Sequence, residues 1–285
     1  MVLESLFNPF TMKKNPWEMF FVGLLYSWIS LFISYLVFRQ YSGLLMIFFI
    51  IFASLPLLYN VIKHEEEIDM KFESEWKILK EHSKVIIFLF FFFIGILIGL
   101  TLAYVFLPSG MVESIFHIQS SAIQDINNSV SGGVTSFSLF KAIFLNNLKV
   151  LFFCLVFSFL YGMGAIFILT WNASVVATAI GNLIKSKIAL LTSGFGFATA
   201  ASYFSITTFS FLRYMTHGIV EIAAYFVAGL AGSIISVAVI KHNLENERVL
   251  YDALDLVFIS LGILLFAALV EVYITPALFS SYYGV

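Results

Sequence analysis

The amino-acid sequence predicts an all-α membrane protein, a polytopic transmembrane helix bundle of about seven spans, within a range of six to eight. The chain of 285 residues is 61% hydrophobic and only 11% charged, whereas soluble domains carry about 25% charged residues. Its polar side chains are too few to cover a globule in water. A single cysteine excludes a disulfide scaffold, and a net charge of −2 gives no indication of nucleic-acid binding.

Seven segments have the apolarity, and close to the length of about 20 residues, that a membrane helix needs. They are Trp17–Phe38, Leu44–Ile62, Val85–Leu107, Val150–Thr170, Ile188–Leu212, Met215–Ile240 and Leu254–Phe279. Helices are expected because the bilayer offers no water to satisfy backbone groups, and the sequence lacks the alternation of a membrane barrel. Trp171–Ile184 stays open as a re-entrant segment or an extra crossing.

The distribution of Lys and Arg favours a multi-pass protein of the cell membrane with the N-terminus in the cytoplasm and the C-terminus outside. With the seven predicted spans, eleven of the 15 Lys and Arg residues fall on the cytoplasmic side, as the positive-inside rule requires. We therefore expect four parts. These are a cytoplasmic segment (1–16), three spans (17–107) that include a charged cytoplasmic helix (63–84), an outer loop (108–141) and a helical core (142–285).

Acidic residues lie well inside the predicted spans at two positions, Glu221 in the sixth span and Glu271 in the seventh. His217 precedes Glu221 by one helical turn, so these two side chains share a helix face. Antiparallel packing of the two spans can bring Glu271 to the same level in the outer leaflet. Charge inside a span costs about 2.5–3.5 kcal/mol on insertion scales, which marks the three residues as a candidate site.

This intramembrane polar cluster has three interpretations. Hydrogen-bonded carboxyl groups can tie two helices together. Paired acids beside a histidine can also bind a proton or a cation, and the three side chains match the number of protein ligands of a zinc centre. The sequence contains no HExxH, phosphate loop, nucleophile elbow or CxxC pattern. We therefore predict no catalytic residues, no metal and no cofactor, and a protein that is not an enzyme.

A series of motif residues runs through the second half of the chain. It consists of Asn146, the pair Trp171-Asn172, Gly181, the run His217-Gly218-Ile219-Val220-Glu221, Gly229, Gly232 and the run Glu271-Val272-Tyr273-Ile274-Thr275-Pro276. This spacing resembles the stage II sporulation protein M family over about Lys141–Pro276. The resemblance implies a membrane-embedded helical bundle with His217, Glu221 and Glu271 at its centre. It also implies a non-catalytic membrane component that works with partner proteins.

The sequence and the resemblance together predict a scaffold or subunit of a membrane complex. The alternative is a small-solute or ion and proton-coupled transporter that uses His217, Glu221 and Glu271. The expected partners are the lipid bilayer and a membrane or envelope protein, and no nucleic acid. A homodimer is compatible with the small residues of the fifth and sixth predicted spans.

Overall fold

The computed structural model describes residues 15–69, 75–130, 136–161, 165–189, 197–240 and 247–279, and every regular element within them is helical. The elements are α3 (Glu18–Val37), η1 (Arg39–Tyr41), α4 (Ser42–Asp69), α5 (Glu75–Phe106), α6 (Ser109–Val130), α7 (Ser136–Tyr161), α8 (Ala165–Ala189), α9 (Phe197–Ile240), α10 (Glu247–Leu269), η2 (Val270–Ile274) and α11 (Thr275–Phe279). Within this described part, seven helical segments are long and apolar enough to cross a membrane. The predicted fold class is therefore confirmed.

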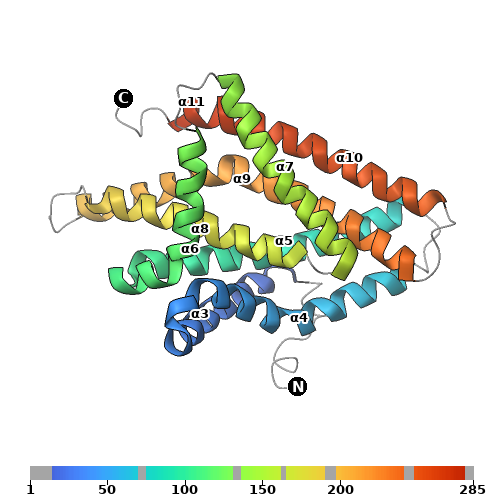
Figure 1. Ribbon diagram of the computed structural model, residues 1–285, viewed down its shortest axis with the longest axis horizontal. Helices are drawn as coiled ribbons and strands as arrows, with labels where there is room; N and C mark the ends of the chain where they lie inside the picture. Colours follow the sequence, from blue (N-terminus) through green and yellow to red (C-terminus); the bar gives the residue numbers. More distant parts are fainter. Residues whose placement is uncertain are drawn as a thin grey trace.

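The helices form two packed groups that α8 joins. In the first group α3 packs along α5 and α4, and in the second α9 packs along α7 and α10, while α8 contacts both α5 and α9. The ends of α4 and α9 lie toward the right in Figure 1, and the end of α8 and the short α11 lie toward the left. This arrangement gives the bundle two opposite ends, along the direction in which most of the long helices run.

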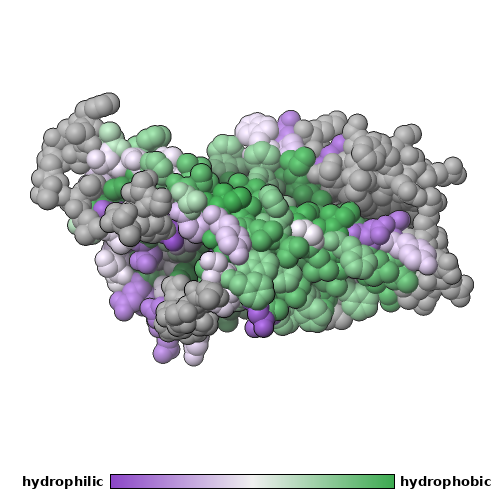
Figure 2. Space-filling model, turned by 90° about the horizontal axis from the view of Figure 1, so that it is seen from above, coloured by the Kyte–Doolittle hydropathy of each residue, from purple (hydrophilic) through white to green (hydrophobic). Residues whose placement is uncertain are grey.

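The middle of the bundle presents an apolar surface to its surroundings. Large side chains such as Phe106, Phe204 and Phe258 are exposed on three different helices. Figure 2 shows the hydrophobic residues as a broad band across the centre of one face, with hydrophilic residues toward its two ends. Such a surface would be costly in water but suits a lipid environment, so the chain is an integral membrane protein.

Glycines let the helix backbones approach closely in both groups. A Cβ atom on Gly95 of α5 would lie 2.1 Å from the carbonyl oxygen of Phe20 in α3, and one on Gly232 of α9 would lie 2.5 Å from that of Leu155 in α7. No larger side chain fits at these distances. The contacts therefore follow the rule that small residues form helix interfaces in membranes.

The fourth and fifth membrane helices differ from the sequence prediction. The predicted span Val150–Thr170 is divided, since α7 ends at Tyr161 and α8 begins at Ala165. Two of the three residues between them are glycines, which disfavour a helix interior. Trp171–Ile184, which the sequence left open, lies within α8, a helix long enough to cross the membrane by itself.

The predicted fifth and sixth spans, Ile188–Leu212 and Met215–Ile240, correspond largely to one continuous helix, α9, of 44 residues. The predicted spans leave a gap at Arg213. Its guanidinium instead lies 5.4 Å from the ring centre of Tyr214, a favourable cation–π distance, and the backbone stays helical. At 1.5 Å per residue, α9 is about 66 Å long, roughly twice the thickness of the hydrocarbon core.

The segment 108–141, expected as an outer loop, is mostly helical because α6 occupies its first two thirds and α7 begins at Ser136. Val112, Ile115 and Phe116 share one face of α6 and are buried, and α6 contacts α4 and α8. Its many Ser, Gln and Asn residues indicated a loop, but the spacing of its apolar residues is that of an amphipathic helix.

The predicted charged helix 63–84 is helical where it is described, at the end of α4 and the beginning of α5. Residues 70–74 lie outside the described residues, and so does most of the expected cytoplasmic segment 1–16.

Candidate functional site

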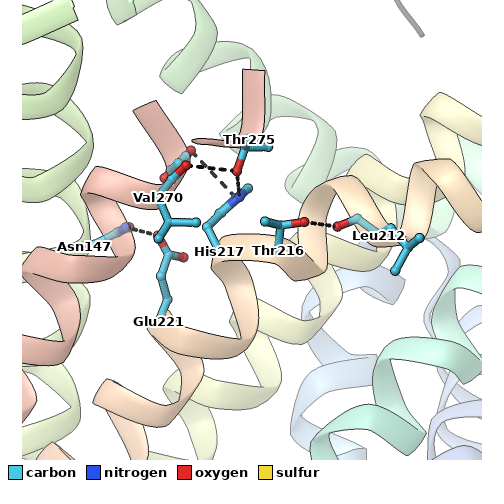
Figure 3. A network of polar contacts seen from close by, with 8 residues as sticks. Asn147, Leu212, Thr216, His217, Glu221, Val270 and Thr275 are labelled. Atoms are coloured by element: carbon cyan, nitrogen blue, oxygen red, sulfur yellow. Dashed lines mark hydrogen bonds and ion pairs between the residues drawn. The ribbon is translucent and has the colours of Figure 1, made fainter. Parts of the chain in front are cut away.

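A polar cluster lies where α7, α9 and the C-terminal helical segments meet (Figure 3). It consists of Asn147 from α7, His217 and Glu221 from α9, Glu271 from η2 and Thr275 from α11. The structure therefore brings together the three residues that the sequence selected as an intramembrane cluster, and it adds a partner from a third helix.

Asn147 connects α7 to the cluster through its side-chain amide, which donates a hydrogen bond to Oε1 of Glu221. Asn147 is buried, together with Leu151 and Cys154 on the same side of α7. The family resemblance pointed to the neighbouring Asn146, which is exposed. The spacing of Leu151 and Cys154, four and seven residues after Asn147, is the signal that would have identified the inward-facing asparagine.

The carboxyl groups of Glu221 and Glu271 hydrogen-bond to each other. An ionised carboxylate is only an acceptor, so a hydrogen bond between two carboxyl groups needs a proton on one of them. The pair therefore carries at most one negative charge. This matters inside a membrane protein, where an unpaired charge away from water is far more costly than a hydrogen-bonded neutral group.

His217 links the acid pair to the C-terminal helix through both ring nitrogens. Its Nε2 lies 3.8 Å from Oε1 of Glu271, and its Nδ1 lies 3.3 Å from Oγ1 of Thr275. The Thr275 hydroxyl donates its own proton to the carbonyl of Val270, at 3.1 Å. Nδ1 must then carry a proton and donate it to Thr275, because a hydroxyl has a single hydrogen to give.

With one proton fixed on Nδ1 of His217, two distributions of the remaining protons give the cluster zero net charge. In one, both carboxyl groups are protonated and the imidazole is neutral. In the other, one carboxyl group has lost its proton to Nε2 of His217, which gives a carboxylate beside an imidazolium. The two arrangements hold the same number of protons, so they interconvert without placing a net charge in the bundle. The distance of 3.8 Å between Nε2 and Glu271 requires a small approach or a bridging water for this transfer.

A π-helical turn, η2, sets the position of Glu271 and Thr275. Thr275 donates its backbone N–H to the carbonyl of Val270, five residues earlier. Pro276, the next residue, has no N–H, and its ring clashes with the carbonyl four residues before it, so a regular α-helical turn is disfavoured there. Single π-turns of this kind are frequent at functional sites. Pro276 itself is exposed.

The cluster is closed on one side and more open on the other. Tyr225 is buried, and it interacts electrostatically with Glu221 and Glu271 from one turn further along α9. On the other side, the side chain of Glu271 is 28% exposed and that of His217 is 12% exposed. Among the residues that the structure describes, no three His, Cys, Asp or Glu side chains are placed to hold a metal ion.

Three further motif positions contribute no polar side chain to the cluster. The Asn172 amide donates to the carbonyl of Ile168 in its own helix, at 2.9 Å. Gly181 of α8 lies against the ring of Tyr104, where a Cβ atom would approach within 2.7 Å. Gly218 is buried on α9 and would tolerate a Cβ atom at an ordinary contact distance of 3.5 Å. These positions shape helix packing rather than the polar site.

Comparison with known proteins places this architecture in a family. The family model described as Stage II sporulation protein M matches residues 85–276, which include the whole cluster and more than half of the chain. The chain belongs to the stage II sporulation protein M family. The uncharacterized protein MJ0793 of Methanocaldococcus jannaschii is 30% identical over 145 residues, which cover 48% of this chain and 71% of that protein. No solved structure matches the chain.

The match to the stage II sporulation protein M family covers the later helices of the structure and leaves out the first two membrane helices. It begins within α5 and includes α6 to α10, η2 and Thr275-Pro276 at the start of α11. Helices α3 and α4 lie outside it. The family region therefore contains the group of α7, α9 and α10 that the polar cluster joins, together with α8, which connects this group to α5.

Substituting Asn147 by Leu tests the contact between α7 and α9. We expect Asn147→Leu to lower the free energy of unfolding by about 1–2 kcal/mol, because Oε1 of Glu221 loses its donor inside the protein. Thermal unfolding of the purified protein in detergent measures this effect. Asn146→Leu is the matched control, since the exposed neighbour is expected to change stability by less than about 0.5 kcal/mol. Equal effects of the two substitutions would contradict the assignment.

Proposed function

We propose that this member of the stage II sporulation protein M family is a non-catalytic scaffold or subunit of a membrane complex. The observation that carries the proposal is that the polar groups of the cluster are paired with other groups of the same chain. The amide of Asn147 is bound to Glu221, and the two ring nitrogens of His217 face Thr275 and Glu271. A network satisfied in this way ties helices together and needs no bound substrate to complete it.

In this proposal the polar cluster keeps one surface of the bundle in a fixed shape for a partner protein. It joins residues of α7, of α9 and of the segments η2 and α11 that follow α10, so these parts of the bundle are held together. The sequence of 63–84 contains five Lys and seven acidic residues. This distribution suits contacts with a partner at the membrane surface in addition to contacts within the bilayer.

We place the N-terminus in the cytoplasm and the C-terminus outside the cell membrane. With the observed helices, Lys185 and Lys187 leave the cytoplasmic set because α8 ends on the opposite side. Nine of the 15 Lys and Arg residues still lie on the cytoplasmic side, beyond the apolar windows, which supports the same orientation. They are Lys13, Lys14, Lys63, Lys71, Lys77, Lys80, Lys84, Lys241 and Arg248.

This orientation puts the polar cluster near the outer interface. The predicted sixth span begins at Met215, whereas α9 begins at Phe197. Counted from the cytoplasmic end of α9 at Ile240, His217 is about 35 Å away along the helix, which exceeds the hydrocarbon thickness of about 30 Å. Helix tilt brings the cluster back to the level of the outer leaflet or its interface.

A cross-linked pull-down from native membranes tests the scaffold proposal. We expect the wild-type protein to capture a defined membrane or envelope protein. Glu271→Gln, which keeps the size of the side chain but removes its charge, should weaken capture if the cluster fixes the docking surface. Asn146→Leu serves as the control for expression and folding, and thermal unfolding checks each variant. Recovery of a folded wild-type protein without any partner would contradict the proposal.

The open side of the cluster favours a second candidate, a proton-coupled or cation-coupled transporter. Glu271 is partly exposed and interacts with the buried Glu221. For a transporter, we expect proteoliposomes to show a flux that depends on the pH gradient, and Glu271→Gln to abolish this flux while the protein stays folded. A flux of equal size in empty liposomes, or in liposomes with the variant, would exclude this candidate.

A further inference from the structure

An apolar groove lies between α7 and α10 on the outside of the bundle. Its volume is about 720 Å³, and its walls are Leu145, Leu148, Lys149, Leu151, Phe152, Phe153, Leu155 and Val257. Phe152 and Phe153 are exposed. Of the seven membrane segments in the described chain, the one in α7 is the least covered by other helices. The groove is therefore open to the lipid phase along the outer side of α7.

Lys149 is the charged residue in this groove. It follows Asn147 by two residues but lies on the opposite side of α7, where it is exposed while Asn147 is buried. No hydrogen bond or ion pair links Lys149 to another residue that the structure describes. A cationic side chain on a lipid-facing helix surface is costly unless it meets an anion or reaches the interface. The groove therefore combines apolar walls with one positive charge that favours an anionic occupant.

The side chains that line the groove favour a lipid over a second protein helix as its occupant. Where helices of this protein pack on each other, glycines such as Gly95 and Gly232 allow the backbones to approach. The groove has no glycine, alanine or serine in its walls and consists of Leu, Phe, Val and the Lys149 stem. Large flexible side chains keep another helix at a distance, but they conform well to a flexible hydrocarbon chain.

We propose that this groove is a binding site for an anionic phospholipid. The acyl chain lies along Leu148, Phe152 and Val257, and the phosphate accepts a hydrogen bond from the ammonium group of Lys149. Lysine is a common phosphate ligand, and its long stem reaches from apolar walls toward the headgroup level. The proposal does not depend on whether the protein is a scaffold or a transporter, since Lys149, Phe152 and Phe153 are exposed on α7 and are not part of the polar cluster.

Native mass spectrometry of the full chain in detergent tests this site with two probes, phosphatidylglycerol and phosphatidylcholine with identical acyl chains. We expect the wild-type protein to retain phosphatidylglycerol about fivefold more tightly, as one Lys near anionic lipid contributes about 1 kcal/mol. Lys149→Gln should remove this preference. Lys141→Gln, an exposed lysine of the same helix that does not line the groove, should keep it.

Equal retention of the two lipids by the wild type would overturn the proposal. It would also be overturned if Lys149→Gln and Lys141→Gln reduced the preference for phosphatidylglycerol to the same extent. Filling the groove with Val257→Trp is expected to reduce retention of both lipids, and unchanged retention would overturn the assignment of the groove. If that variant does not fold, a photo-crosslinking residue at position 153 in native membranes replaces it. An adduct with the mass of a lipid is expected there, whereas an adduct with a polypeptide would overturn the lipid assignment.

Discussion

A carboxyl group inside a membrane protein needs hydrogen-bonding partners, and this requirement shapes the whole C-terminal half of the molecule. Glu221 obtains its partners from two other segments, Asn147 of α7 and Glu271 of η2. Neither partner is supplied by the helix that carries Glu221. The three segments must therefore lie together for the acid to be satisfied, and separating them would leave polar groups unpaired where water is scarce.

The close contacts in the rest of the bundle depend on small residues. The glycines of α3, α5 and α9 bring backbones together without polar groups, so dispersion forces hold these contacts. The polar cluster is specific, because the amide of Asn147 reaches Glu221 in one register only. Small residues thus provide close packing, while the cluster defines how α7 and α10 are placed on α9.

The sequence predicted those parts of the structure that depend on composition and on local spacing. The fold class, the membrane helices of the first half and the shared face of His217 and Glu221 follow from apolarity and helical periodicity. The boundaries in the second half did not follow. The predicted fifth and sixth spans stop on either side of Arg213, whereas α9 continues through it, with the guanidinium over the ring of Tyr214. Which of the two adjacent asparagines faces Glu221 depends on how α7 packs on α9, and that is a tertiary property.

A double-mutant cycle between Asn147 and Glu221 tests the central claim, that a hydrogen bond between these side chains fastens α7 to α9. The free energies of unfolding of the wild type, Asn147→Leu, Glu221→Leu and the double variant give the coupling between the two residues. We expect a coupling of about 0.5–2 kcal/mol, with the double variant less unstable than the sum of the single effects, because the loss of Glu271's partner is common to Glu221→Leu and the double variant, whereas the Asn147–Glu221 hydrogen bond can be lost only once. Additive effects, with a coupling near zero, would contradict the claim.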